Sequence, residues 1–123
     1  MSQDIVSDAL NEIMNAKRAK KETVLIRKHS KLLRNILDIA KDSGYLDYEI
    51  NGNDLIVKIK NLNEIKAIKP RFTVSVKKID YYTRRFLPAR NFGFIIVSTN
   101  QGLMKGEEAQ EKKLGGCLIA YIY

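Results

Sequence analysis

The sequence predicts an α+β fold of two small modules: an N-terminal α-β-α-β-β module over residues 1–62 and a mainly β C-terminal module with short helices over residues 63–123. Apolar residues at helical spacing in the first part of the chain, a hairpin signature around Asn51-Gly52, and two almost wholly apolar runs near the C-terminus support this class. A chain of 123 residues, 45% of them hydrophobic, can hold a core without disulfides or metals.

The first expected element is an amphipathic helix that begins at Asp4. Its apolar residues recur at helical spacing: Val6, Ala9, Leu10, Ile13 and Met14. A basic run over residues 17–21 ends the helix, and the β-prone residues 24–26 predict a short strand.

A second helix is expected after Ser30, which has the side chain that a helix N-cap requires. The apolar stripe of this helix is Leu33, Ile36, Leu37 and Ala40. Gly44 follows at a position where a left-handed residue ends a helix.

Residues 46–59 have the alternation typical of a β-hairpin. In the first strand Leu46, Tyr48 and Ile50 alternate with Asp47 and Glu49, and in the return strand Leu55, Val57 and Ile59 share one face. Asn51-Gly52 supplies the turn. Residues 61–69 lose the pattern, and we expect them to connect the two modules.

In the second module we expect a strand through Phe72, Val74 and Val76 and a helix over residues 77–86 that stops before Pro88. The remaining expected elements are a strand over 94–97 buried on both faces, a turn over 98–102, a brief strand over 103–104, a short helix over 107–113, a break at Gly115-Gly116, and a strand over 117–123.

The charge of the chain favours a polyanionic partner. Its 22 Lys and Arg residues against 14 Asp and Glu residues give a net charge of +8. Cations that neutralise phosphates release condensed counterions, so nucleic acid is the first interpretation, while an acidic membrane or a merely basic surface stays open.

The same composition excludes most catalytic and metal chemistry. One cysteine, Cys117, and one histidine, His29, leave no internal disulfide, no multi-thiolate zinc site and no triad. The N-terminus does not resemble a secretory signal, and no apolar stretch approaches the roughly 20 residues of a membrane span. We expect a soluble intracellular protein that needs no cofactor and no metal.

The polar turn over residues 98–102 is the most informative candidate site. It consists of Ser98, Thr99, Asn100, Gln101 and Gly102. Hydroxyls and amides both donate and accept hydrogen bonds, which suits RNA 2′-hydroxyls, phosphates and base edges. An ordinary polar turn is the alternative, and no nucleophile motif surrounds the serine.

Gly115 and Gly116 have two interpretations. They form either a helix cap followed by a turn, or a place where a bare backbone approaches a sugar-phosphate chain, if it lies beside residues 98–102.

Basic residues gather over residues 17–34 and 58–90. In the second stretch aromatic and guanidinium side chains interleave: Tyr81, Tyr82, Arg84, Arg85, Phe86 and Arg90. Such rings can stack on unpaired bases, but a solvated basic face with aromatic core residues is the plainer interpretation.

Several segments together resemble a known family. They are SDALNEIMNA (7–16), VLIRKHSKLL (24–33), IKPRF (68–72), LPARNFG (87–93), FGFIIVSTNQGLM (92–104), EEA (107–109) and LGGCLIAYIY (114–123). Covering nearly the whole chain, they resemble the S-eight family of small-subunit ribosomal proteins, in its archaeal and eukaryotic branch.

The resemblance implies a structural constituent of the small ribosomal subunit that binds the central domain of small-subunit rRNA and supports subunit assembly and translation in the cytoplasm. It implies neighbouring small-subunit ribosomal proteins as further partners, no membrane or DNA partner, no catalysis, and a monomer away from the ribosome. One alternative is an RNA-binding regulator that recognises a similar element in an mRNA. A second alternative is an enzyme acting on RNA, but the sequence shows no acid–base pair or metal cluster for it.

The resemblance also assigns RNA-binding residues. The main RNA-reading loop falls on Ser98, Thr99, Asn100 and Gln101, with a second contact at Gly115 and Gly116. Weaker N-terminal contacts fall near Asn15, Lys28, Ser30 and Lys31. Cys117 stands where bacterial relatives commonly have a glutamate, so an acidic contact is not carried over.

Overall fold

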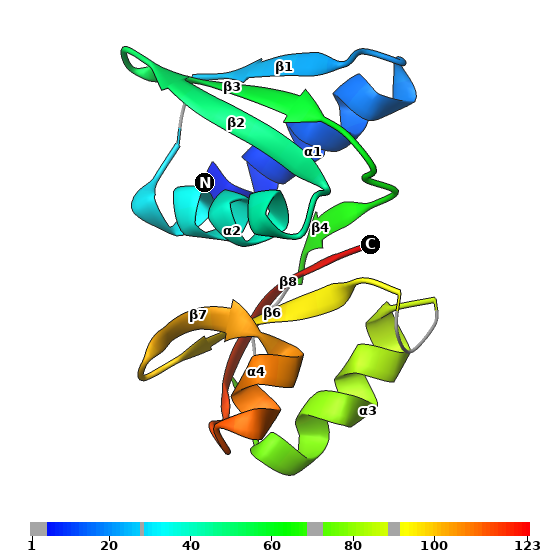
Figure 1. Cartoon of the computed structure of the whole chain (residues 1–123), viewed down its shortest axis with the longest axis vertical. Coiled ribbons are helices and arrows are strands. Elements are labelled where there is room, and N and C mark those ends of the chain that lie inside the picture. Colours follow the sequence, from blue (N-terminus) through cyan, green and yellow to red (C-terminus); the bar gives the residue numbers. More distant parts are fainter. Residues whose placement is uncertain (1–4, 28, 69–72, 89–91) are drawn as a thin grey trace. The chain divides into compact units, whose positions relative to one another are not determined.

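The structure is a computed structural model that describes residues 5–27, 29–68, 73–88 and 92–123 (Figure 1). By its internal contacts the chain divides into two compact units, Met1–Lys66 and Ala67–Tyr123. Each unit mixes helices with an antiparallel sheet, as the α+β prediction requires.

The first unit has the predicted α-β-α-β-β order. Its elements are α1 (Ile5–Arg18), β1 (Thr23–Ile26), α2 (Lys31–Asp42), β2 (Leu46–Asn51) and β3 (Asp54–Ile59). The three strands form an antiparallel sheet in the order β1-β3-β2. Figure 1 shows α1 and α2 together on one side of this sheet. The predicted apolar stripes of both helices are buried, so helical periodicity located this half of the core.

Local chemistry fixes both ends of α2. The Ser30 hydroxyl accepts a hydrogen bond from the Leu33 N–H at 3.3 Å, which is the expected N-cap. Gly44 has φ +82°, the left-handed conformation that ends a helix without a Cβ penalty.

The β2–β3 hairpin turns one residue later than predicted. Asn51 pairs with Asp54, so the two turn residues are Gly52 and Asn53 and not Asn51 and Gly52. Gly52 has φ +64°, and placing it first in the turn leaves Asn51 in the strand. Ile50 lies near this tip and is 56% exposed, so it does not extend the buried row of the strand.

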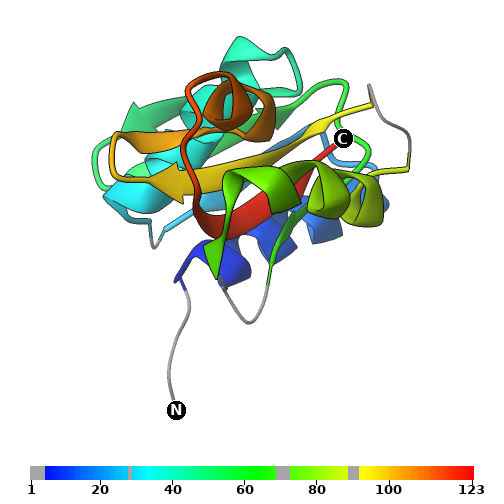
Figure 2. The ribbon, with the colours of Figure 1, turned by 90° about the horizontal axis from the view of Figure 1, so that it is seen from below.

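The second unit is built on a five-stranded sheet. Its elements are β5 (Thr73–Val74), α3 (Val76–Phe86), β6 (Phe94–Thr99), β7 (Gly102–Lys105), α4 (Gly106–Glu111) and β8 (Gly116–Ile122), and β4 (Ile65–Ala67) spans the division between the units. The strand order is β4-β8-β6-β7, and β5 also pairs with β8. Figure 2 shows the β6–β7 hairpin beside β8 with α3 lying along the sheet.

One face of this sheet packs against the two helices of the unit. Ile95, Val97 and Leu118 from the strands share a buried cluster with Ile79 of α3 and Ala109 of α4. The continuous apolar run 94–97 is buried at every position, as expected for a strand with both faces covered.

The division between the two units lies within residues 61–69, the expected connector, but two details of this region differ from the prediction. The expected connector 61–69 contains a strand, β4, and the expected strand through Val76 is only Thr73–Val74, because Val76 begins α3. Phe72 lies outside the described residues. These strands are held by pairing with the distant β8, which local alternation does not reveal.

Candidate nucleic-acid interface

The predicted polar turn is the tip of the β6–β7 hairpin. Ser98 and Thr99 end β6, Gly102 begins β7, and only Asn100 and Gln101 lie in the turn itself. The expected five-residue loop is therefore wrong, because cross-strand pairing continues to Thr99 and Gly102. The side chains of Asn100 and Gln101 are exposed at the tip of a stiff ribbon.

The Thr99 hydroxyl closes this turn from within. It donates to the Gly102 carbonyl oxygen at 2.9 Å and accepts from the Gln101 N–H at 3.1 Å. Gly102 has φ +111°, which L side chains rarely adopt. Thr99 and Gly102 therefore set the shape in which the two exposed amides are presented.

Ser98 lies beside the glycine pair. It pairs with Cys117 of β8 on one side and with Leu103 of β7 on the other. It is half-buried, and within the part of the chain that the structure describes its hydroxyl has no hydrogen-bond partner. The glycine pair therefore lies next to residues 98–102, as the interpretation of a backbone that approaches a sugar-phosphate chain requires.

Packing against the protein's own backbone explains both glycines. A Cβ built on Gly116 would lie 2.2 Å from the Ser98 carbonyl oxygen, and a Cβ built on Gly115 would lie 2.8 Å from the Val74 carbonyl oxygen. They do not cap α4, because Lys112 is its C-cap and Lys113 has the left-handed φ of +57°. The first interpretation is therefore wrong about the cap.

The registers define a row across this end of the sheet. Leu103, Ser98, Cys117 and Thr73 are successive cross-strand partners, on β7, β6, β8 and β5. They project to the side opposite Val97 and Leu118, which face the helices. Thr73 was not predicted from the sequence. The available signal was its position as a polar residue directly before buried Val74.

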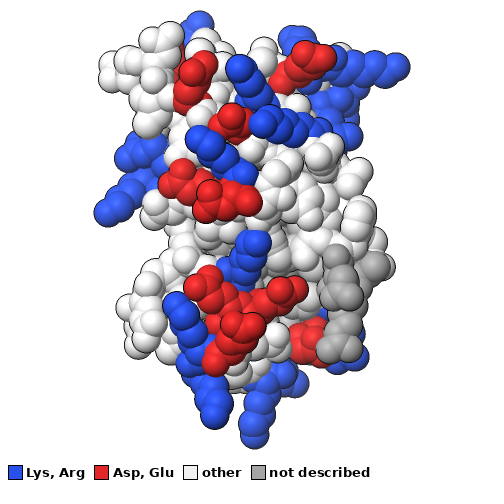
Figure 3. Space-filling model, in the orientation of Figure 1, with Lys and Arg blue, Asp and Glu red and all other residues white. Residues whose placement is uncertain are grey.

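Charge near this row is uneven. Lys112 pairs with Glu108 at 3.3 Å, and Lys113 is exposed next to the glycine pair. The exposed side of α4 is acidic, with Glu107, Glu108 and Glu111. Figure 3 shows this acidic group flanked by basic side chains in the second unit. A phosphate chain is attracted to the lysine and repelled by α4.

The predicted N-terminal contacts do not form one cluster. Ser30 and Lys31 lie together at the start of α2, with Lys31 exposed. Asn15 is exposed on the C-terminal half of α1, where its side-chain oxygen accepts from Arg18 at 3.3 Å. Lys28 lies outside the described residues.

His29 is held between two polar groups. Its Nδ1 is 2.9 Å from Arg34 Nη1, and its Nε2 is 3.0 Å from the Asn53 carbonyl oxygen. A guanidinium only donates, so Nδ1 accepts from Arg34 and Nε2–H donates to the Asn53 carbonyl oxygen. The histidine therefore ties the start of α2 to the tip of the β2–β3 hairpin.

The aromatic residues of α3 mostly stack on each other. The Tyr82 and Phe86 rings are stacked at 6.3 Å, and Phe86 stacks on Tyr121 at 5.5 Å. Tyr81 is 49% exposed, with Lys78 Nζ 5.7 Å from its ring centre. Arg90 lies outside the described residues. Tyr82 and Phe86 thus fit the plainer interpretation better than base stacking.

Two further features are absent from the described residues. They contain no group of three or more His, Cys, Asp or Glu side chains that could hold a metal ion. No helix in the described ranges has the length and apolarity needed to cross a membrane.

Comparison with known proteins gives a consistent result. A family model described as Ribosomal protein S8 matches residues 4–123. A protein named small ribosomal subunit protein uS8 from Archaeoglobus fulgidus is 42% identical over 129 aligned residues, and one of the same name from Nanoarchaeum equitans is 39% identical over 129. Each alignment covers 100% of this chain and 100% of the relative, so the similarity extends through both units.

Proposed function

This chain belongs to the ribosomal protein S8 family, and from that premise we propose that it is a structural constituent of the small ribosomal subunit that binds the central domain of small-subunit rRNA. Its role there is to support subunit assembly and translation in the cytoplasm. Its relatives are ribosomal proteins of archaea, in agreement with the branch that the sequence resembles. Like them, it acts by binding and not by catalysis.

The observation that carries the rRNA proposal is the position of Ser98 beside Gly116 on adjacent strands. An RNA backbone can approach this end of the sheet closely because Ser98 has a short side chain, while Gly116 lets β8 lie close against the Ser98 backbone. The strands behind them are buried and stiff, so little conformational entropy is lost when RNA binds.

The hairpin residues then have separate roles. Ser98 contacts RNA through its hydroxyl, and Asn100 and Gln101 reach base edges or 2′-hydroxyls with amides that both donate and accept. Thr99 and Gly102 hold the turn, as their hydrogen bond and positive φ suggest. Gly115, Gly116 and exposed Lys113 border the path of the phosphate chain.

The first unit supplies orientation. Lys31 and Lys28 neutralise phosphates. Ser30 and Asn15 add polar contacts that contribute less to the binding free energy. These contacts carry no sequence information, so they anchor any RNA of suitable shape. With the net charge of +8 they supply the salt-dependent part of the affinity.

Replacing Ser98 tests the proposal. Ser98→Ala should weaken binding to a central-domain transcript by about 1–2 kcal/mol, because one buried hydrogen bond to RNA is lost. Affinity is measured by filter binding at physiological salt, and the unfolding free energy is measured in parallel to show that the fold is intact. Full-strength binding by a folded Ser98→Ala variant would refute the assignment of the hairpin.

Lys31→Ala is the matched control. It removes one phosphate contact, so it should weaken binding to all RNAs alike and lower the salt slope by about 1. An mRNA regulator is separated from a ribosomal constituent by sedimentation, because only the constituent co-migrates stoichiometrically with small subunits.

A further inference from the structure

Strand β1 is an edge of the first unit's sheet. It pairs with β3 on one side, and the sheet order β1-β3-β2 gives it no strand on the other. An edge strand presents unpaired N–H and C=O groups that can accept another extended chain.

The register identifies these groups. The Ile59 N–H donates to the Glu22 carbonyl oxygen at 2.8 Å, so these two residues stand at a hydrogen-bonded position of the ladder. Hydrogen-bonded positions alternate along an antiparallel pair, so Val24 and Ile26 bond to β3. The N–H and C=O groups of Thr23 and Leu25 therefore point outward, and no partner for them occurs among the described residues.

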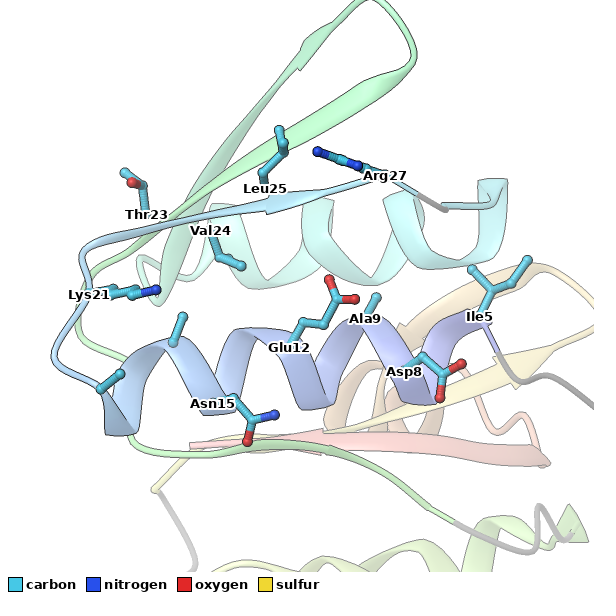
Figure 4. Close-up of a pocket in the computed structure, with 12 residues that line it drawn as sticks. Ile5, Asp8, Ala9, Glu12, Asn15, Lys21, Thr23, Val24, Leu25 and Arg27 are labelled. Carbon is cyan, nitrogen blue, oxygen red and sulfur yellow. The ribbon is translucent and has the colours of Figure 1, made fainter.

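A groove runs beside this edge. It lies between α1 and β1, has a volume of about 770 Å³, and is shown in Figure 4. Small residues make room for it: Ala9 and Ala16 on α1, and Ala19 directly after the helix. Val24 points toward α1, whereas Leu25 points away from it and is 46% exposed.

The part of the groove beside Asp8 and Glu12 favours a cationic occupant over RNA, while Asn15, a proposed RNA contact, lines it about one turn further along α1. Asp8 and Glu12 of α1 are exposed along it, and no ion pair of either occurs within the described part of the chain. Lys21 and Arg27 lie toward the two ends of β1. A nucleic-acid strand along this edge would bring phosphates beside both carboxylates, which costs Coulomb energy.

The spacing of the carboxylates fits a strand. Residues four apart on a helix are about 6 Å apart along its axis, and alternate residues of a strand are about 6.7 Å apart. A strand added to β1 would thus present every second side chain to Asp8 and Glu12. The intervening side chains would lie on the side of Leu25, which suits apolar residues.

We propose that β1 takes up an extended segment of another protein, with Lys or Arg at alternate positions and apolar residues between them, as a fourth strand beside α1. Backbone hydrogen bonds to Thr23 and Leu25 hold the segment, and Asp8 and Glu12 select its charge. The proposal rests on the proposed function in one respect: the partner is taken to be another protein of the small subunit.

The binding test uses two synthetic peptides of ten residues, one alternating Lys with Val and the other alternating Glu with Val. The full-length chain should bind the Lys-Val peptide at least tenfold more tightly than the Glu-Val peptide. Glu12→Lys should weaken binding of the Lys-Val peptide at least threefold, whereas it would strengthen binding of an RNA strand. Equal affinity for the two peptides would overturn the proposal.

A proline substitution tests the strand pairing itself. Thr23→Pro removes an outward N–H at the first position of an edge strand, where proline is tolerated. It should weaken binding of the Lys-Val peptide at least fivefold, while Thr23→Val, which keeps the N–H, should not. Circular dichroism shows that both variants are folded, and equal peptide affinity of the two would contradict strand addition.

The same variants separate this site from the hairpin. Thr23→Pro should bind the central-domain transcript normally, and Ser98→Ala should bind the Lys-Val peptide normally. A photo-crosslinking residue placed at Leu25 in assembled small subunits should react with a protein segment of alternating basic and apolar residues. Crosslinks to rRNA alone would overturn the proposal and leave the rRNA-binding function of the hairpin untouched.

Discussion

At the residue scale, two neighbouring hydroxyls have different environments. The Thr99 hydroxyl both donates and accepts within its own turn. Ser98 projects from the sheet beside Gly116, with no partner for its hydroxyl among the described residues. A ligand at this end of the sheet can therefore bind the Ser98 hydroxyl without breaking a bond inside the protein.

Replacement of Gly116 should disturb the packing of β8 against β6. In Gly116→Ala the new methyl group would lie 2.2 Å from the Ser98 carbonyl oxygen, so β6 and β8 must separate. Overpacking of this kind costs about 2–3 kcal/mol of unfolding free energy, measured by urea denaturation. RNA affinity should fall as well, because Ser98 moves.

Gly44→Ala is the control for backbone strain alone. Gly44 has φ +82° but open space around its Cβ position, so the loss should be about 1 kcal/mol. Equal losses for the two variants would show that the close approach to Ser98 does not matter.

Because of Tyr48, the stability of the first unit should depend on pH in the alkaline range. Its hydroxyl donates to the Asp38 carboxylate. Burial and this contact raise the pKa of Tyr48 to about 12, which favours the protonated ring in the folded state. The unfolded ring loses its proton near pH 10, so the stabilisation is full below that pH and is lost as pH rises toward 12.

Comparison with Tyr48→Phe isolates this effect. At about pH 9 the natural chain should be more stable than the variant by about 0.5–1 kcal/mol, through one hydrogen bond. This advantage should shrink as pH rises from about 10 to about 12, as followed by urea unfolding. An advantage that stayed constant over this range would contradict the raised pKa.

At the element scale, periodicity located the structures whose cause is local. The stripes of α1 and α2, the cap at Ser30 and the end at Gly44 depend on residues close in sequence. β4 was missed and β5 was predicted too long, because strands of two or three residues depend on a distant partner, β8. The sequence left the roles of Ser98 and Gly116 undecided for the same reason, because only the register of β6 on β8 brings the two residues together.

Ser30, at the start of α2, has both a structural role and a proposed RNA-binding role. Ser30→Ala removes the acceptor for the Leu33 N–H and should cost about 1 kcal/mol of unfolding free energy. Ser30→Asp keeps a capping oxygen and should restore the stability.

The pair of variants separates the two roles. If Ser30 lies near a phosphate, Ser30→Asp should weaken RNA binding through charge repulsion although the protein is as stable as the natural chain. Equal RNA affinity of Ser30→Asp and the natural chain would remove Ser30 from the interface and leave it as a cap alone.

At the scale of the whole molecule, a chain of net charge +8 also carries local groups of exposed carboxylates. In the second unit Glu107, Glu108 and Glu111 are exposed on α4, and in the first unit Asp8 and Glu12 line the α1–β1 groove, whereas Lys31 is exposed at the start of α2. The two partners that we propose differ accordingly: rRNA at the hairpin, and a cationic protein segment at β1.

Footprinting of small-subunit rRNA tests the rRNA-binding claim most directly. The natural chain and the double variant Asn100→Ala/Gln101→Ala are bound to the full rRNA at physiological salt and probed with hydroxyl radicals. The natural chain should protect one contiguous region of the central domain, and the double variant should lose part of that protection while remaining folded. Protection that is absent from the central domain, or that is identical for the two proteins, would contradict the account.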